Sequence, residues 1–139
     1  MKRFIMAFFA AYIFLFVWGW LINGVLLKDI YAESAHLWRP ENEMRSLFHW
    51  IIIGQALIVF GFVMIYASGF AGGGMIAGIR LGLLLEIAAI GMRLCFYAVQ
   101  PIPGKLIFYG SIGGIIEIVV VGAMVGAIYK PAPARSSSQ

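Results

Sequence analysis

Long runs of apolar residues dominate the chain, and short polar segments separate them. A helix needs roughly 20 apolar residues to cross the hydrocarbon of a bilayer, because each residue rises about 1.5 Å along the axis. Transmembrane strands would instead alternate apolar and polar residues over about ten positions, and these runs are apolar on every face. Four runs are long enough: residues 4–27, 47–66, 74–99 and 106–129. The pattern predicts an all-α integral membrane protein, a four-transmembrane-helix bundle that forms one domain over residues 1–129.

The segments between the runs are polar, rich in glycine or rich in proline. A polar loop covers residues 28–46, a glycine-rich turn covers 68–73, and a tight proline-containing connection covers 101–104. Residues 130–139 form a polar C-terminal tail rich in proline and serine. We expect these segments to lie outside the hydrocarbon, where water satisfies their backbone groups.

The first loop carries the signature of a helix start. Pro40 is followed by Glu41 and Glu43, which places proline at the first helical position and acids beside the positive end of the helix dipole. The second helix is therefore expected to begin near Pro40 and to stand above the bilayer surface. Three amphipathic aromatic residues suit the membrane–water interface in this region: Tyr31, Trp38 and Trp50.

Composition supports the membrane assignment and excludes several classes of protein. Of the 139 residues, 63% are hydrophobic and 12% are charged, which rules out a water-soluble fold and a disordered chain. The net charge of +4 is spread over segment ends rather than gathered in a patch, so nucleic acid is not an expected partner. The single cysteine, Cys95, excludes internal disulfides and is expected to be a buried apolar residue.

The N-terminal run is expected to be a retained helix rather than a signal peptide, because it is too long and no small-x-small cleavage site follows it. Basic residues assigned to one side of the membrane are Lys2, Arg3, Arg80, Lys130 and Arg135. Those assigned to the other side are Lys28, Arg39, Arg45 and Lys105. This nearly even count, together with the basic N-terminus and tail, favours cytoplasmic termini in a bacterial inner membrane.

Glycine spacing predicts where helices pack. In lipid, association depends on close approach at small residues, because burial brings no hydrophobic gain. The stripes on the third and fourth helices are Gly74, Gly78, Gly82, Gly110, Gly114, Gly122 and Gly126. The second helix offers Gly54 and Gly61, seven residues apart and thus on nearly the same face. These stripes predict either a compact bundle or docking onto another chain.

Ionisable residues within the runs are the strongest functional signal. Glu86 and Glu117 lie near the middle of their spans, where a charge costs about 3 kcal/mol on insertion scales. Arg93 follows Glu86 by seven residues on the same face, and its side chain leans back toward the helix N-terminus. We expect both carboxyls at similar depth, facing each other, with one of them protonated at neutral pH. Outer polar residues are expected to complete this intramembrane cluster: Gln55, His49 and Asn23.

Two interpretations of the cluster remain open. It is either a proton or ion relay or small polar binding site, or a structural ion pair that fixes helix register. No Ser/His/Asp arrangement, phosphate loop or metal-ligand pair is found, so neither an enzyme nor a metal site is predicted. A bis-histidine haem is not expected, because His36 lies in the polar loop. No cofactor is expected beyond contact with bound lipid or pigment.

Short segments resemble a group of small four-helix bacterial inner-membrane proteins that has no assigned activity. The segments are residues 23–31, 37–44, 78–82, 100–104 and 128–131. The resemblance implies the architecture and the bacterial inner membrane only. Where such proteins often have histidine before the glycine of the first helix, this chain has Asn23, which argues further against metal or haem.

The sequence therefore predicts a non-catalytic membrane protein. The preferred interpretation is an accessory or scaffolding subunit of a larger respiratory, photosynthetic or oxidase complex, docked through glycine-rich helix faces. The alternative is a small homo-oligomeric, proton-linked carrier or channel that uses Glu86 and Glu117. In both cases the partners are the lipid bilayer and either other membrane subunits or further copies of the chain.

Overall fold

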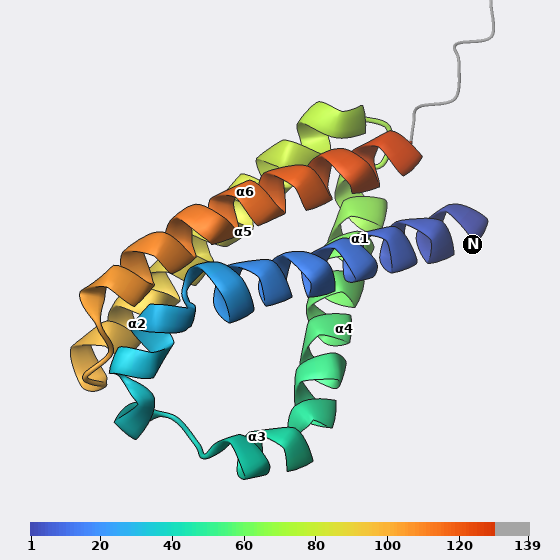
Figure 1. Cartoon of the computed structure of the whole chain (residues 1–139). Coiled ribbons are helices and arrows are strands. Elements are labelled where there is room, and N and C mark those ends of the chain that lie inside the picture. Colours follow the sequence, from blue (N-terminus) through green and yellow to red (C-terminus); the bar gives the residue numbers. More distant parts are fainter. Residues whose placement is uncertain (130–139) are drawn as a thin grey trace, which may run out of the picture.

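The computed structural model describes residues 1–129, and every element in that range is helical (Figure 1). The predicted tail, residues 130–139, lies outside the described residues. The long elements are α1 (Lys2–Leu21), α4 (Phe48–Ile65), α5 (Gly74–Val99) and α6 (Gly104–Ile128). Single π-helical turns extend two of them: η1 (Ile22–Leu26) after α1 and η3 (Tyr66–Phe70) after α4.

These elements form four helices long and apolar enough to cross a membrane. Their bounds are Lys2–Leu26, Phe48–Phe70, Gly74–Val99 and Gly104–Ile128, within a few residues of the four predicted runs. The all-α prediction is confirmed for the described residues, and the chain has the form of a multi-pass membrane protein.

The first loop is more structured than the sequence indicated. It contains α2 (Lys28–Glu33), the 3-10 turn η2 (Ala35–Leu37) and α3 (Glu41–Ser46). A short helix does start directly after Pro40, which is its extended cap, but the expectation that the second membrane-spanning helix begins there is wrong, because that span starts at Phe48. At Leu47 the backbone leaves helical geometry (ψ 4°), so α3 is a separate short helix and does not continue directly into α4.

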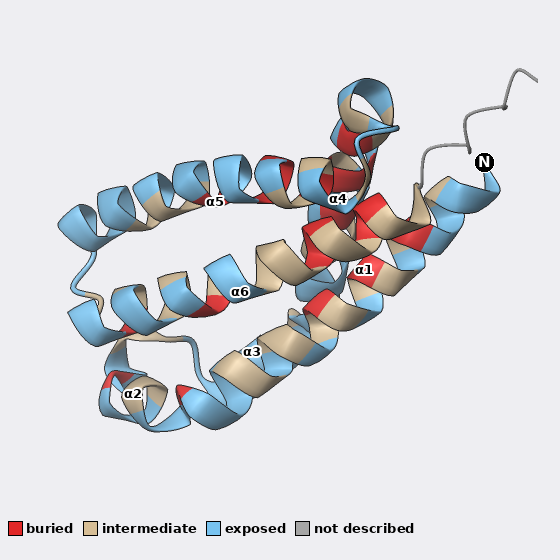
Figure 2. Ribbon diagram, turned by 90° about the horizontal axis from the view of Figure 1, so that it is seen from above, coloured by how far each residue is buried: buried red, intermediate tan, exposed pale blue. Residues whose placement is uncertain are grey.

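Three of the long helices lie side by side, while the fourth crosses them. α5 and α6 run antiparallel, α1 lies along α6, and α4 runs across this layer (Figure 1, Figure 2). The C-terminal half of α4 is buried in the core. Its N-terminal half meets α1 through long side chains: the Tyr12 hydroxyl donates a hydrogen bond to the Ile52 carbonyl oxygen (3.3 Å), and the Phe16 and Phe48 rings are in edge contact. The four helices are therefore unequally packed.

The core lies where α4 crosses α1 and α6. Its fully buried members are Ala7 and Ala11 of α1, Val59 and Val63 of α4, Tyr66 of η3, and Val121 and Val125 of α6. The two alanines are one helical turn apart, so they leave space for α4 to approach the α1 backbone. The Tyr66 hydroxyl donates a hydrogen bond to the Gly74 carbonyl oxygen (2.9 Å), which ties the end of the second span to the start of the third.

The glycine stripes of α5 and α6 face each other. A methyl group at Gly78 would overlap the Gly122 carbonyl, and one at Gly126 would overlap the Gly74 carbonyl. A methyl group at Gly82 would lie 2.8 Å from the Ile118 carbonyl oxygen. Backbone therefore contacts backbone along this seam, and these stripes are used within the chain. Gly110 is an exception, because nothing lies within 4 Å of a methyl group placed there.

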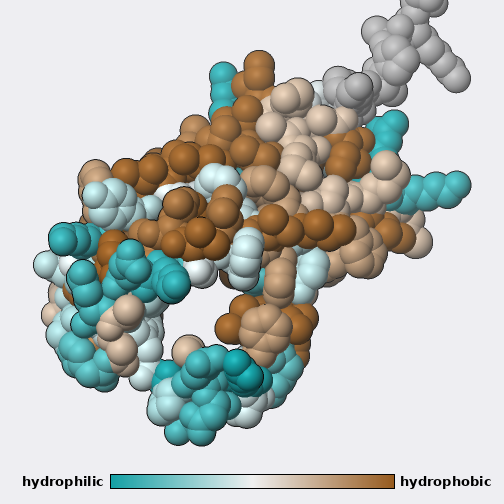
Figure 3. All heavy atoms as spheres, in the orientation of Figure 1, coloured by the Kyte–Doolittle hydropathy of each residue, from teal (hydrophilic) through white to brown (hydrophobic). Residues whose placement is uncertain are grey.

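The surface has the polarity that a membrane environment requires. Apolar side chains cover α1 and α6, while hydrophilic side chains gather over α2 and α3 (Figure 3). Large apolar residues are exposed along all four spans, including Phe9, Ile58, Ile87 and Phe108. Cys95 is also exposed on α5, so the expectation that it is buried is wrong. An apolar thiol has no need of a protein core when hydrocarbon surrounds the helix.

Candidate functional site

An ion pair lies near the centre of α5. The Arg93 Nη1 atom is 2.5 Å from the Glu86 Oε1 atom, as the seven-residue spacing predicted. The Glu86 side chain is 8% exposed, and that of Arg93 is 33% exposed. Because both residues belong to one helix, α5 carries its buried acid and the neutralising base together.

A glycine of α6 makes room for this pair. A methyl group at Gly114 would overlap the Glu86 carboxylate and would lie 3.0 Å from the Arg93 Nη2 atom. The absent side chain is therefore what lets the α6 backbone cover the pair and keep it out of lipid. Gly114 serves the ion pair, whereas Gly122 and Gly126 serve backbone contact.

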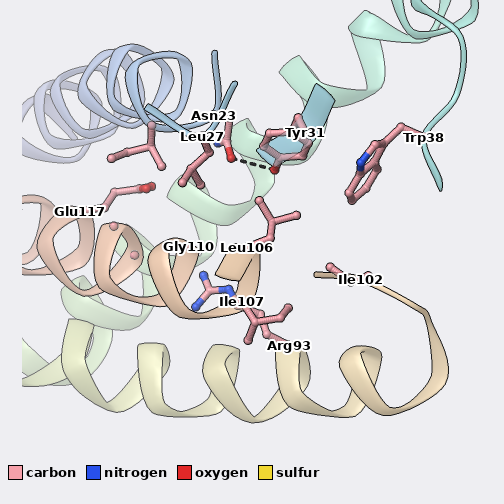
Figure 4. Close-up of a pocket in the computed structure, with 13 residues that line it drawn as sticks. Asn23, Leu27, Tyr31, Trp38, Arg93, Ile102, Leu106, Ile107, Gly110 and Glu117 are labelled. Carbon is pink, nitrogen blue, oxygen red and sulfur yellow. Dashed lines mark hydrogen bonds between the residues drawn. The ribbon is translucent and has the colours of Figure 1, made fainter. Parts of the chain in front are cut away.

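Glu117 lies at the depth of Glu86 but turns to another side. Glu117 lies 13 residues after the start of α6, and Glu86 lies 13 residues before the end of α5. The end of α5 and the start of α6 lie at the same end of this antiparallel pair. Both are thus about 20 Å along their helices from that end. The charges of Glu86 and Arg93 both act on the partly buried Glu117. The matched depth is confirmed, but Glu117 points toward Leu27 and Asn23 rather than toward Glu86 (Figure 4).

A cavity of about 270 Å³ connects Glu117 with the end of the molecule that carries α2. Glu117 lies at one end of it, while Trp38 and Ile102 lie at the other (Figure 4). The α6 wall between them consists largely of glycine: Gly110, Gly113 and Gly114. These residues place no side chain in the cavity, so Arg93 on α5 also reaches its lining.

Hydrogen bonds organise the outer end of the cavity. The Tyr31 hydroxyl donates to Asn23 Oδ1 (3.0 Å), and Asn23 Nδ2 donates to the Gly19 carbonyl oxygen (2.9 Å). The Trp38 indole donates to Ser34 Oγ (3.1 Å), and the Tyr31 and Trp38 ring centroids are 5.3 Å apart. Burial raises the pKa of the Tyr31 hydroxyl above its ordinary value. The sequence indicated these two aromatic residues only as interface anchors.

Another hydrogen bond joins α1 to α6 near the inner end. The Trp18 indole donates to the Gly113 carbonyl oxygen (3.0 Å). A methyl group at Gly113 would lie 3.3 Å from the Ile22 side chain, so α1 also packs closely there. Neither Trp18 nor Gly113 was predicted from the sequence to contribute to the site. Gly113 directly precedes Gly114 and does not belong to the predicted stripe, whose glycines are spaced by four, so the spacing did not indicate it.

The structure divides the predicted polar cluster. Asn23 lines the cavity with Arg93 and Glu117, whereas Gln55 lines an adjoining groove of about 840 Å³ between α1, the first loop and α4. The groove and the cavity share Asn23, Tyr31 and Trp38 as lining residues. The Gln55 Oε1 atom is buried without a hydrogen-bond partner among the described residues. His49 is exposed and contacts the Trp50 ring, so neither reaches the cavity. Trp50 is 62% exposed on α4, away from Tyr31 and Trp38.

Comparison with known proteins gives no match to a family model, a curated protein or a solved structure. Within residues 1–129, no group of three or more His, Cys, Asp or Glu side chains is placed to hold a metal ion. The chemistry of the site therefore rests on its own groups. Glu86 and Arg93 neutralise each other, and Glu117 remains as one further acid that faces a cavity.

Proposed function

We propose that this chain is a non-catalytic accessory or scaffolding subunit of a larger complex in a bacterial inner membrane, with cytoplasmic termini. One observation carries the proposal. α4 is long enough to span a membrane, yet it packs on its own chain along one face only. The opposite face, which carries Gly54 and Gly61, meets nothing of the described chain. A helix of this kind is completed by a partner helix from another subunit.

The face that α4 offers to a partner contains small residues. Successive residues of a helix are rotated by about 100°, so Gly54 and Gly61 fall roughly opposite the buried Val59 and Val63. Nothing lies within 4 Å of a methyl group placed at either glycine. The predicted docking through glycine-rich faces is therefore assigned to α4, because the stripes of α5 and α6 already pack on each other.

Purification of the tagged chain in a mild detergent, without added partners, tests the role. Larger membrane subunits should co-purify at fixed stoichiometry with the wild-type chain. They should be lost from the double variant Gly54→Ile/Gly61→Ile, because bulky side chains prevent close helix approach. The matched control is Gly91→Ile on α5, which also has open space beside it. Retained partners in the double variant, or a homo-oligomer alone, would contradict the proposal.

A second function is supported by a different observation. Glu117 ends a cavity that reaches the α2 side of the molecule and lies beside the Glu86–Arg93 pair. A carboxyl reached in this way is what a small proton-linked carrier or channel requires. In vesicles, Glu117→Gln should then abolish proton flux while assembly stays intact. Lost assembly with no transport defect in Glu86→Gln or Glu117→Gln would support the structural role instead.

A further inference from the structure

The cavity between α1, α2 and α6 has the charge of a cation site. Glu86 already neutralises Arg93, so the three ionisable groups at this depth sum to one negative charge when Glu117 is ionised. Among the described residues, Glu117 is the one carboxylate that lines the cavity. An anion would gain little here, because the Arg93 charge is already balanced.

The other end of the cavity suits an organic cation better than a metal ion. Tyr31 and Trp38 present two aromatic rings there, and an aromatic face attracts a cation within about 6 Å of its centre. The Asn23 Oδ1 atom lies between the rings and Glu117 as a further acceptor (Figure 4). Apolar lining residues such as Leu27, Leu106 and Ile107 would contact alkyl groups.

The volume and the position of the mouth agree with this assignment. A volume of about 270 Å³ is several times the share of one water molecule, which is roughly 30 Å³. The mouth is lined by the first loop and by the connection that contains Ile102, which lie on the same side of the molecule. A charged ligand can therefore enter from the membrane surface without crossing acyl chains.

We propose that this cavity binds a small protonated organic amine, held at the inner end by the Glu117 carboxylate, and that the Tyr31 and Trp38 rings line the outer end through which the amine enters. The site is independent of the accessory role, since docking through α4 involves another surface. It adds a ligand class to the alternative function, because a carrier that exchanges a proton for an amine needs one carboxylate that both can occupy.

Calorimetric titration of the purified chain in detergent with tert-butylammonium tests the site, and tert-butanol is the neutral control of nearly equal shape. We expect one ammonium to bind per chain and the alcohol not to bind. Glu117→Gln should lower the association constant at least tenfold, whereas Trp38→Leu, at the far end of the cavity, should leave it within about twofold of the wild-type value. Asp29→Asn is the matched control, because Asp29 is an exposed acid on α2 that does not line the cavity.

The proposal is overturned if the wild-type chain does not bind the ammonium, if the alcohol binds equally well, or if Glu117→Gln binds like the wild type. Thermal unfolding checks that each variant is folded. If Glu117→Gln does not fold, Glu117→Asp retains the charge on a shorter side chain and should bind at least threefold more weakly than the wild type. None of these results depends on whether partner subunits co-purify, so failure of this site and failure of the accessory role are distinguishable.

Discussion

The α5–α6 pair and α4 are equally apolar, yet they are packed very differently. α5 and α6 contact each other through backbone at Gly78 and Gly122, and they enclose an ion pair. α4 meets α1 along one face, through buried side chains near its C-terminal end and through Phe48 and Ile52 near its start, and leaves the opposite face free of the described chain. In lipid, apolar character alone does not drive association, so the difference lies in where small and polar residues are placed. Gly54 and Gly61 are small but face away from the chain.

The largest effect is expected from the ion pair that only the α5–α6 region contains. Arg93→Met leaves Glu86 buried without its partner and should lower the free energy of unfolding by about 3 kcal/mol. This is the low end of the range for buried pairs, because the Arg93 side chain is 33% exposed. Denaturant unfolding in detergent measures the loss. The double variant Glu86→Gln/Arg93→Met should recover most of it, and equal loss in the exposed control Arg80→Met would contradict the assignment.

Backbone contact between α5 and α6 should give the next largest effect. Gly122→Ala places a methyl group against the Gly78 carbonyl and should cost about 2 kcal/mol through overpacking. Gly110→Ala is the control on the same helix, where the space is open. Because alanine favours a helix over glycine by up to about 1 kcal/mol, this control should be neutral or stabilising. If both variants changed the stability in the same direction, the close contact between α5 and α6 would not depend on Gly122.

Within α4, the two faces should respond unequally to loss of apolar side chains. Val63→Ala removes contacts of a side chain with no exposed surface and should destabilise the chain by about 1 kcal/mol. Leu57→Ala, at a residue that is 65% exposed, should change stability by less than about 0.5 kcal/mol. Thermal unfolding of both variants in one detergent compares them. If Leu57→Ala lowered stability as much as Val63→Ala, the exposed face of α4 would have to pack on the chain.

The smallest effect is expected at the outer end of the cavity, where α2 joins the end of the first span. Burial raises the pKa of Tyr31, so its neutral form is favoured in the folded chain. The stability it contributes is present below the ordinary tyrosine pKa of about 10 and is lost as the pH rises above it. The wild type should therefore lose more stability than Tyr31→Phe in strongly alkaline buffer. Parallel alkaline unfolding curves for the two would contradict this.

The sequence predicted the parts that depend on local spacing. Span positions follow from the length of apolar runs, and the contact between Glu86 and Arg93 follows from two turns of one helix. The glycine stripes were also visible in the spacing, but whether they pack on each other, as Gly78 and Gly122 do, or on another chain was left open.

The remaining features depend on which helix face meets which neighbour, and a uniformly apolar pattern does not indicate this. α4 is hydrophobic on every face, so no stripe showed which face would meet α1 or that Gln55 would be separated from Glu117. Glu117 was expected to face Glu86, but it lies on the α6 face that meets α1 and α2. The helix α2 was missed because it is only six residues long, lies in the polar loop and lacks a capping signature.

Because glycines form much of the α6 wall of the cavity, the size of the cavity can be changed by substitution. Its space exists because Gly110, Gly113 and Gly114 carry only hydrogen. Replacing Gly110 by alanine and then by valine would reduce the volume of the cavity stepwise while Arg93 and Glu117 remain unchanged. Shape selectivity and electrostatic attraction are therefore controlled by different residues, and each can be altered without the other.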